Sequence, residues 1–278
     1  MDGAHLRDEI VTRLRAELGG PRSPAVCLAT VVVGGDGPAL ANVAAKHRAA
    51  AAAGMRTRDV RLGGDVTQAQ LEAEVEALAR DPAVHGVFVQ LPLPPGLREE
   101  PVLDLVPPIK DVDGLSAESL GRLVRGEPGH VPCTADAVLR LLARHGVATE
   151  GRTAVVVGHS RYVALPVGLL LARTTSGCRV TLVGPDDPAL DTVCHAADLV
   201  VCAADRPRLI GAAHVRPGAA VVDAGVTRTS DGIVGDVDVD AVAAKAAAVA
   251  PMPGGVGPAT IGCLLDHTAA AARALAGR

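Results

Sequence analysis

Apolar runs and amphipathic stretches alternate along the whole chain. In the first half, 27–33 is a continuous run of β-branched and apolar residues, 87–91 is a second, shorter run, and a weaker strand is predicted near 57–62. A continuous apolar run predicts a strand that is buried on both faces, as in a parallel sheet. Between these runs lie an Ala-rich segment that ends near Ala53 and the stretch TQAQLEAEVEALARD, which begins at Thr67. Both segments are predicted to be helices, the second with a threonine N-cap.

The second half of the chain repeats this alternation. Strands are predicted over 154–157, 179–183, 197–203 and 219–226, and helices over 134–145, over 163–172 and from about residue 261. Strands that alternate with helices form βαβ units with right-handed crossovers. The sequence therefore predicts an α/β fold of two lobes, of which the C-terminal one is a Rossmann-like doubly wound parallel sheet. A cleft between two such lobes is a usual place for a ligand site.

Composition excludes several classes of protein. The chain has 278 residues and a formal net charge of -4, with no basic run and only one Tyr, one Phe and no Trp. A nucleic-acid partner is therefore not expected, because stacking platforms need aromatic side chains. The six cysteines include no CxxC pair, which predicts small buried residues rather than a metal site or a disulfide framework. There is no signal-peptide core and no apolar stretch that could span a bilayer, so we expect a cytoplasmic protein without a membrane partner.

Two polar residues stand in segments that are otherwise apolar. Lys46 lies in the Ala-rich helix, where a lysine is usually a solvated surface charge. If it faces a cleft instead, desolvation lowers its pKa and makes it a candidate for proton transfer. Gln90 lies at the carboxyl end of a predicted buried strand, and ligands bind parallel sheets at the carboxyl ends of their strands. Its amide needs a partner, which is either a neighbouring loop or a ligand.

Two further segments have unusual compositions. KDVDG at 110–114 is compatible with a plain turn, but a carboxylate there could also bind two N–H donors on the edge of a heterocycle. PMPGGVGP at 251–258 places three glycines and three prolines before a predicted helix. Glycine permits close approach of the backbone to a ligand, and a helix start offers N–H donors. This second segment is therefore interpreted as a ligand contact.

Taken in order, five short segments resemble the bifunctional methylenetetrahydrofolate dehydrogenase/methenyltetrahydrofolate cyclohydrolase family. They are VQLPLP (89–94), KDVDG (110–114), PCT (132–134), GDV (235–237) and PGGVGP (253–258). Their order and spacing match the family over nearly the whole chain. The resemblance implies a folate-side domain over 1–133 that is completed by a C-terminal helix over 260–278. It also implies a dinucleotide-binding domain over 134–259 and a homodimer.

The resemblance implies roles for individual residues. Lys46 matches the family's catalytic lysine, Gln90 the glutamine that tunes this lysine, and Asp113 the aspartate that binds the pterin edge. The expected substrate contacts are Asn42, Val89, Leu91, Pro92, Pro253, Gly254 and Gly255. The expected cofactor contacts are Gly158, His159, Ser160, Asp186, Asp205, Gly225 and Val226. The implied reaction oxidises 5,10-methylenetetrahydrofolate with NAD or NADP and then hydrolyses the methenyl product to 10-formyltetrahydrofolate.

The sequence departs from the family at several of these positions. Asn42 replaces a tyrosine that stacks on the folate, and such a ring contributes on the order of 1 kcal/mol beyond its buried area. His159 replaces an arginine that helps to hold the 2′-phosphate of NADP, and Ala164 replaces a glycine at the start of the next helix. Asp205 also replaces a glycine. Asp186 follows Gly184-Pro185 where the family has His-Ser, and a carboxylate there favours NAD, since it accepts from a ribose hydroxyl and repels a phosphate.

These departures leave alternatives open. One is a specialised paralogue with a degraded dinucleotide site, which retains only the cyclohydrolase step or carries out altered one-carbon chemistry. Another is a non-catalytic folate-binding protein or a heterodimer partner. Lys46, Gln90 and Asp113 are compatible both with the bifunctional enzyme and with the specialised paralogue. The folate side is therefore the better preserved half of the resemblance.

Overall fold

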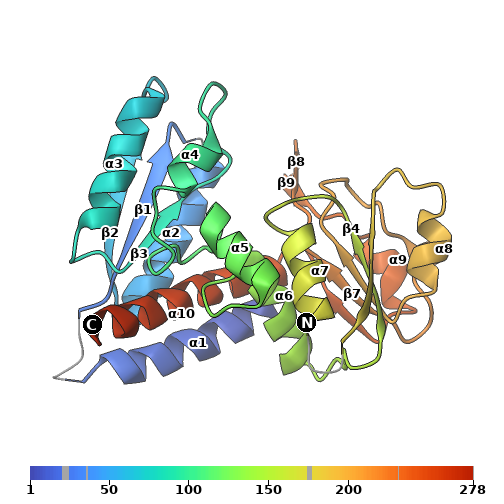
Figure 1. Cartoon of the computed structure of the whole chain (residues 1–278). Helices are drawn as coiled ribbons and strands as arrows, with labels where there is room; N and C mark the ends of the chain where they lie inside the picture. The colour runs from blue at the N-terminus through green and yellow to red at the C-terminus, as the bar shows by residue number, and fades with distance from the viewer. Residues whose placement is uncertain (21–24, 36, 174–176, 231, 278) are drawn as a thin grey trace. The chain divides into compact units, whose positions relative to one another are not determined.

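The computed structural model describes residues 1–20, 25–35, 37–173, 177–230 and 232–277. It divides into two compact units, each of which contains one parallel sheet (Figure 1). The three-stranded unit comprises Asp8–Cys133 and Ile261–Arg278. The five-stranded unit comprises Met1–Arg7 and Thr134–Thr260. The α/β class and the parallel sheets predicted from the hydrophobic pattern are therefore confirmed.

In the three-stranded unit, β1 (Cys27–Val33) lies between β2 (Arg56–Leu62) and β3 (Gly86–Val89). Both neighbours are parallel to β1, and six of its seven residues are buried, as its apolar run predicts. By contrast, β2 has the sequence RTRDVRL, in which four of seven residues are charged, and it is largely exposed at one edge of this sheet. The third strand is shorter than predicted: it ends at Val89, and Gln90 and Leu91 already belong to the following loop.

Helices complete this unit. They are α2 (Gly37–Ala52), α3 (Gln68–Arg80), α4 (Glu99–Leu103) and α5 (Ala117–Arg125), together with most of α1 (Gly3–Leu18) and of α10 (Val256–Ala276). Helix α6 (Cys133–Arg144) contributes only Cys133 and otherwise belongs to the five-stranded unit. The predicted N-cap of α3 is present, since the Thr67 hydroxyl accepts from the backbone N–H of Gln70 within a capping box. Helix α2 carries Lys46, and α3 buries a stripe of four residues that includes Leu71 and Val75.

The five-stranded sheet has the order β10-β7-β6-β4-β5, and all its strands are parallel. Its strands are β4 (Thr153–Val157), β5 (Arg179–Val183), β6 (Leu199–Cys202), β7 (Ala220–Asp223) and β10 (Ala248–Ala250). The helices of this unit include α7 (Ala164–Ala172), α8 (Leu190–His195) and α9 (Val239–Ala243), with a short 3-10 turn η1 (Ala212–His214). A hairpin that the sequence pattern did not predict, β8 (Thr227–Thr229) and β9 (Gly232–Val234), follows β7.

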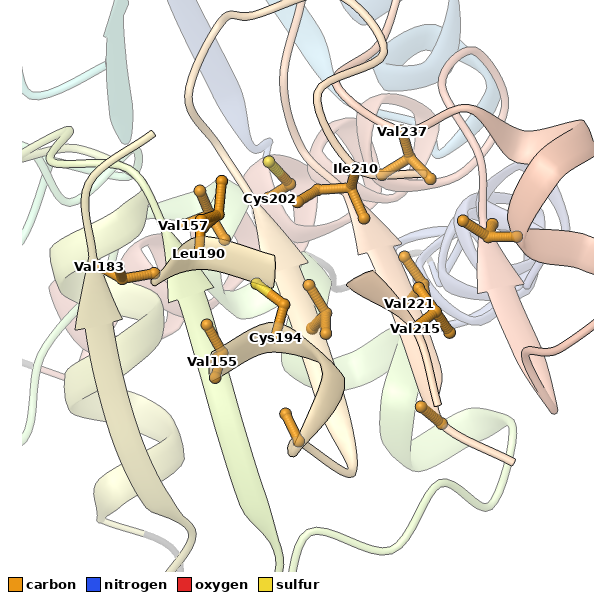
Figure 2. Packing of buried hydrophobic residues seen from close by; sticks show 14 residues of the cluster. Val155, Val157, Val183, Leu190, Cys194, Cys202, Ile210, Val215, Val221 and Val237 are labelled. Carbon is orange, nitrogen blue, oxygen red and sulfur yellow. The ribbon is translucent and has the colours of Figure 1, made fainter. Parts of the chain in front are cut away.

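Small side chains fill the core beside this sheet. In Figure 2, Val155 and Cys202 lie among other residues of one buried cluster, with Leu190 and Cys194 of α8 packed against them. Five of the six cysteines are buried and Cys27 is half-buried, in agreement with the prediction of small buried residues. Within the described parts of the chain, no helix is both long and apolar enough to cross a membrane.

The strand order of the five-stranded sheet indicates where a dinucleotide would bind. The chain passes from β4 to β5 on one side of β4 and then returns to β6 on its other side. In open α/β sheets a dinucleotide binds at the carboxyl ends of the strands, where the order reverses. The loops that follow β4 and β6 are therefore the candidate dinucleotide loops of this chain.

Candidate active site

Lys46 is buried inside the three-stranded unit. Only 4% of its surface is exposed, although it lies on a helix with exposed polar neighbours. Its Nζ donates to Asn42 Oδ1 at 3.0 Å and lies 4.5 Å from the centroid of the Phe88 ring. Asn42 and Lys46 share one helix face because they are four residues apart. The interpretation of Lys46 as a solvated surface lysine is therefore wrong.

An amide relay connects Lys46 to the end of β3. Asn42 Nδ2 donates to Gln90 Oε1 at 3.4 Å, and Gln90 Nε2 donates to the backbone oxygen of Leu91 at 2.6 Å. The ammonium group can only donate, which fixes the orientation of the Asn42 amide and then that of Gln90. Gln90 thus reaches Lys46 through Asn42, the residue that stands in place of the expected tyrosine.

The two aspartates of KDVDG have different roles. The carboxylate of Asp111 accepts from the backbone N–H groups of Gly114, Leu115 and Ser116 at 2.9–3.2 Å, so it holds the turn. The turn interpretation is correct for this residue. Asp113 is half-buried and close enough to Lys46 for each to influence the charge of the other. Asp113 is therefore the carboxylate of this segment that is available for chemistry.

Burial shifts both members of this charged pair toward neutrality. Desolvation lowers the pKa of Lys46 to about 8, although the charges of Asp113 and Cys133 act in the opposite direction. Desolvation, together with the charge of Asp111, raises the pKa of Asp113 to about 6, against the effects of Lys46, of a hydrogen bond from Cys133 and of His267. Near pH 7, roughly one Lys46 in ten is then a free amine. A lysine with this pKa can both accept and return a proton.

The substrate-side residues near this cluster differ in exposure. Asn42 and Pro92 are exposed, Leu91 is half-buried, and Val89 is buried in β3. The peptide bond between Leu91 and Pro92 is cis. The structure therefore brings Lys46, Asn42, Gln90 and the residues up to Pro92 together in one unit.

The remaining expected substrate contacts lie in the loop before α10, within the five-stranded unit. The peptide bond between Met252 and Pro253 is cis, and the N–H of Gly255 donates to the backbone oxygen of Pro251 at 2.8 Å. The backbone oxygen of Gly254 accepts from the N–H of Gly3 at 2.9 Å. The start of the chain thus packs on this glycine-rich loop.

The loop after β4 contacts the loop after β6 at Gly158. This glycine has φ 127°, and a Cβ there would lie 2.1 Å from the backbone oxygen of Ala203. Only glycine allows this approach. Next, the Ser160 hydroxyl accepts from the backbone N–H groups of Tyr162 and Val163 at 3.3 and 3.2 Å, just before α7 begins. His159 is exposed, and its ring lies against Gly184 at the end of β5.

Two buried aspartates shape the loop after β6. Asp236 accepts from the backbone N–H groups of three consecutive residues, 204–206, at 2.6–3.1 Å. Asp223 in turn accepts from the N–H groups of Gly225 and Asp236. A Cβ on Gly225 would lie 2.0 Å from the Asp236 carboxyl carbon, so this position requires glycine. The loops after β6 and β7 are therefore held together by one hydrogen-bond network.

The side chains that depart from the family also form contacts here. Asp205, at φ 53°, accepts from the N–H of Val226 at 3.1 Å. Arg206 Nη2 lies 2.8 Å from Asp186 Oδ2, so an exposed ion pair joins the loop after β6 to the loop after β5. Val226 is exposed and lies beyond the end of β7, which is shorter than predicted and ends at Asp223. The candidate cofactor residues thus gather at the carboxyl ends of neighbouring strands.

Comparison with known proteins agrees with this arrangement. The catalytic-domain model of tetrahydrofolate dehydrogenase/cyclohydrolase matches residues 1–113, and the NAD(P)-binding-domain model matches residues 132–276. The bifunctional protein FolD of Rhodopirellula baltica is 41% identical over 97% of this chain and 94% of its own length. This chain belongs to the tetrahydrofolate dehydrogenase/cyclohydrolase family.

Solved structures of this family have the same fold. The bifunctional FolD enzyme of Campylobacter jejuni has a TM-score of 0.93 and 34% identity, with 98% of each chain covered. The Trypanosoma brucei methylenetetrahydrofolate dehydrogenase-cyclohydrolase, solved with NADP and an inhibitor, has a TM-score of 0.92 and 36% identity, with 99% of this chain and 97% of that one covered. The family resemblance read from five short motifs is therefore confirmed.

The sequence reasoning missed several residues of this family member's site. Phe88 lies under Lys46, Cys133 and His267 surround Asp113, and Asp236 organises the loop after β6. Cys133 lies in the PCT motif and Asp236 in the GDV motif, so the sequence did mark these two residues. His267 lies in an apolar helix where nothing nearby in the sequence marks it, so only the folded chain reveals its neighbours.

Proposed function

We propose that this chain oxidises 5,10-methylenetetrahydrofolate to methenyltetrahydrofolate and hydrolyses that product to 10-formyltetrahydrofolate. The observation that carries the proposal is the buried Lys46, hydrogen-bonded to Asn42 and lying beside Asp113 in a chain of this family. The named relatives are bifunctional enzymes. Neither a specialised paralogue nor a silent partner gains support from them.

In the oxidation step, the residues of this chain bind and orient the folate. The carboxylate of Asp113 is the acceptor for the N–H donors on the pterin edge, and Asn42 and Gln90 supply polar contacts between the exposed surface and Lys46. A nicotinamide dinucleotide, when bound, supplies the hydride acceptor. The residues that would hold it fit this role, because Gly158 lets the loop after β4 pack closely on the loop after β6, and Ser160 lies just before α7, whose first N–H groups can donate to a phosphate.

In the hydrolysis step, Lys46 moves protons. Its free amine takes one proton from the water that attacks the methenyl carbon, and a C–O bond forms. The bond from that carbon to N5 then breaks as the ammonium returns a proton to N5, which leaves the formyl group on N10. The second proton of the water is released to solvent, so the charge of the methenyl cation is balanced. The pKa of Lys46 near 8 suits both transfers.

For the cofactor, we propose NAD over NADP. Asp186 follows β5, where a carboxylate accepts from ribose hydroxyls and repels a 2′-phosphate. His159, whose ring lies against Gly184 at the end of β5, lacks the guanidinium fork with which an arginine binds a phosphate through two N–H groups. The ion pair with Arg206 offsets part of the charge of Asp186, so we expect a preference rather than exclusion. A homodimer and a cytoplasmic location remain predictions.

An absorbance assay tests the proposed reactions. Methenyltetrahydrofolate should appear when methylenetetrahydrofolate is supplied with NAD, more slowly with NADP, and should disappear when it is supplied alone. Lys46→Met should abolish this disappearance, whereas Lys245→Met in the five-stranded unit is the matched control and should not. Faster turnover with NADP than with NAD would overturn the cofactor proposal, and an unchanged hydrolysis rate in Lys46→Met would overturn the role of Lys46.

A further inference from the structure

Phe88 is the only phenylalanine of the chain, and it lies at the candidate active site. It is buried in β3, with 7% of its surface exposed, and Lys46 Nζ lies over the face of its ring, 4.5 Å from the centroid. Both residues belong to the three-stranded unit. A ring that is covered in this way offers no open face on which a folate could stack. Its contact with Lys46 is therefore the feature that relates it to the reaction.

A buried ammonium group needs partners that replace its water. Lys46 is almost wholly buried, and its Nζ donates to Asn42 Oδ1 at 3.0 Å. The face of an aromatic ring carries negative partial charge and attracts a cation that lies over it, more strongly where water is excluded. The Asn42 oxygen and the Phe88 ring together therefore replace part of the hydration shell of Nζ.

These two partners respond differently to the charge of Lys46. The amide oxygen of Asn42 accepts a hydrogen bond from the ammonium and, more weakly, from the neutral amine. The ring face attracts the positive charge itself, so most of this attraction is lost when Lys46 gives up its proton. Phe88 therefore favours the protonated form of Lys46, in opposition to the burial that lowers its pKa to about 8.

Titratable groups also face Lys46 from other elements. Asp113, in the loop before α5, and Cys133, at the start of α6, raise the pKa of Lys46 when they are ionised. His47 follows Lys46 on α2, and burial is the main cause that lowers the pKa of this imidazole, so it is uncharged near pH 8. All four residues of β3 are uncharged. The Phe88 ring does not titrate, so it acts on Lys46 in the same way at every pH.

We propose that Phe88 is a positioning residue for Lys46: its ring face stabilises the ammonium that forms when Lys46 takes a proton from the attacking water. The inference rests on the proposed function, because Lys46 takes this proton only in the hydrolysis step. It deepens that function, since burial alone makes Lys46 a free but weakly basic amine, and the ring makes that amine a stronger base. In a chain with Asn42 in place of the family's tyrosine, Phe88 is the ring that the structure places against the lysine.

Fluorinated phenylalanine tests this contact with little change of shape. Because Phe88 is the only phenylalanine, protein produced with ring-monofluorinated or ring-trifluorinated phenylalanine is altered at this position alone. Fluorine withdraws electrons from the ring face and so weakens its attraction for a cation. The pKa of Lys46 in the free protein, followed by the NMR shift of its carbon-13-labelled ε-carbon, should fall stepwise with fluorination, by about half a pH unit to one pH unit in total.

The same spectra contain their own controls, because the chain has only three lysines, Lys46, Lys110 and Lys245. Lys110 belongs to the same unit, and its Nζ donates to the backbone oxygen of Asp81 at 2.7 Å, so its titration midpoint should not move. Lys46→Met identifies the Lys46 signal by removing it. A Lys46 midpoint that is equal in all three proteins, or that rises with fluorination, would overturn the proposal, because the ring would then act only as an apolar cover.

Substitutions extend the test to the reaction. Phe88→Leu keeps an apolar side chain but removes the ring. The rising limb of the pH profile of kcat/KM for methenyltetrahydrofolate hydrolysis, which reports free-enzyme groups, should then move to lower pH by the same half unit to one unit, and the plateau rate should fall. Phe88→Tyr retains a ring face and should retain the wild-type limb. Val32→Ala, which removes buried apolar volume from β1, is the packing control and should leave the limb unmoved.

The two readouts separate this inference from the proposed function. A Phe88→Leu variant with lower kcat/KM at every pH and an unmoved limb would show a merely structural role and refute the proposal. Hydrolysis by the wild type together with a constant Lys46 midpoint would also refute it and leave the proposed function intact. If the wild type does not hydrolyse methenyltetrahydrofolate but the midpoint falls with fluorination, the proposed function fails and the effect of Phe88 on Lys46 stands.

Discussion

Replacing Lys46 with methionine should stabilise the protein while it abolishes hydrolysis. Methionine has a similar shape and no charge, so it removes the buried ammonium without opening a large cavity. The ammonium is costly here because Lys46 is almost wholly buried and its pKa falls from 10.5 to about 8. A lysine whose pKa is lower in the folded than in the unfolded state destabilises the folded state at every pH at which the lysine is protonated.

The magnitude follows from the pKa. A fall from 10.5 to about 8 corresponds to roughly 3 kcal/mol against the charged form in the folded state. Lys46→Met also removes the hydrogen bond to Asn42 and the contact with Phe88, which together offset about 1 kcal/mol. The net expectation is a gain of about 2 kcal/mol at pH 7.

The stability difference between Lys46→Met and the wild type should depend on pH. Between about pH 8 and 10.5 the unfolded chain holds the Lys46 proton and the folded chain does not, so wild-type stability rises with pH across this window. The advantage of Lys46→Met should therefore be constant below about pH 8 and shrink above it. Urea unfolding followed by far-UV circular dichroism at pH 7, 8 and 9 measures this difference.

Tyr162 provides an internal control for this experiment. It is the sole tyrosine of the chain and belongs to the five-stranded unit, so its fluorescence follows that unit separately. The substitution lies in the other unit, and the gain should be seen in the circular dichroism transition. A variant that is less stable than the wild type by the same amount at all three pH values would refute the reasoning, because it would show that the Lys46 charge is well solvated.

Other substitutions probe the remaining departures. Asn42→Tyr should lower the Kd for a folate analogue by roughly fivefold, measured by calorimetry, because it returns a stacking ring; unchanged affinity would show that the ring has no place to stack. Asp186→Ser should improve the Kd for NADP relative to NAD by about tenfold, since it removes a carboxylate beside the expected 2′-phosphate; an unaltered ratio would show that Asp186 does not contact the ribose. Gly225→Ala should lower stability by about 2 kcal/mol and weaken NAD binding, because its Cβ would meet the Asp236 carboxylate; a normal melting temperature would contradict this contact.

Local patterns predicted several regular elements well. Strands β1 and β5 have the predicted bounds, and the Thr67 cap of α3 is present. The prediction was weaker where elements are short. Helix α5 has nine residues and was not predicted. Its start is capped by Ser116 and its end by Gly126 in the left-handed conformation, and both residues are typical helix boundaries in a sequence. Strand β10 has three residues, which is too few for any period to appear in the sequence.

The active site could be predicted only in part. The family resemblance assigned Asn42 and Lys46 to the site, and the end of a predicted parallel strand placed Gln90 at an edge where ligands bind. The sequence pattern could not decide whether Lys46 is buried, because an Ala-rich helix has no pronounced polar face to compare with. Nor could it separate Asp111 from Asp113, which differ in which backbone N–H groups surround them. Contacts with residues distant in sequence, such as His267, depend on the packing of the whole unit.

The aspartate at position 205 bears on whether the dinucleotide loop is damaged. A glycine there would adopt the left-handed φ of 53° freely, whereas most side chains would be strained by it. Aspartate is among the residues that tolerate this conformation, and its carboxylate gains a hydrogen bond from the N–H of Val226. Its own N–H is held by Asp236, as are those of its two neighbours. The loop therefore keeps its backbone path with aspartate in place of glycine, and what changes is the charge that it presents.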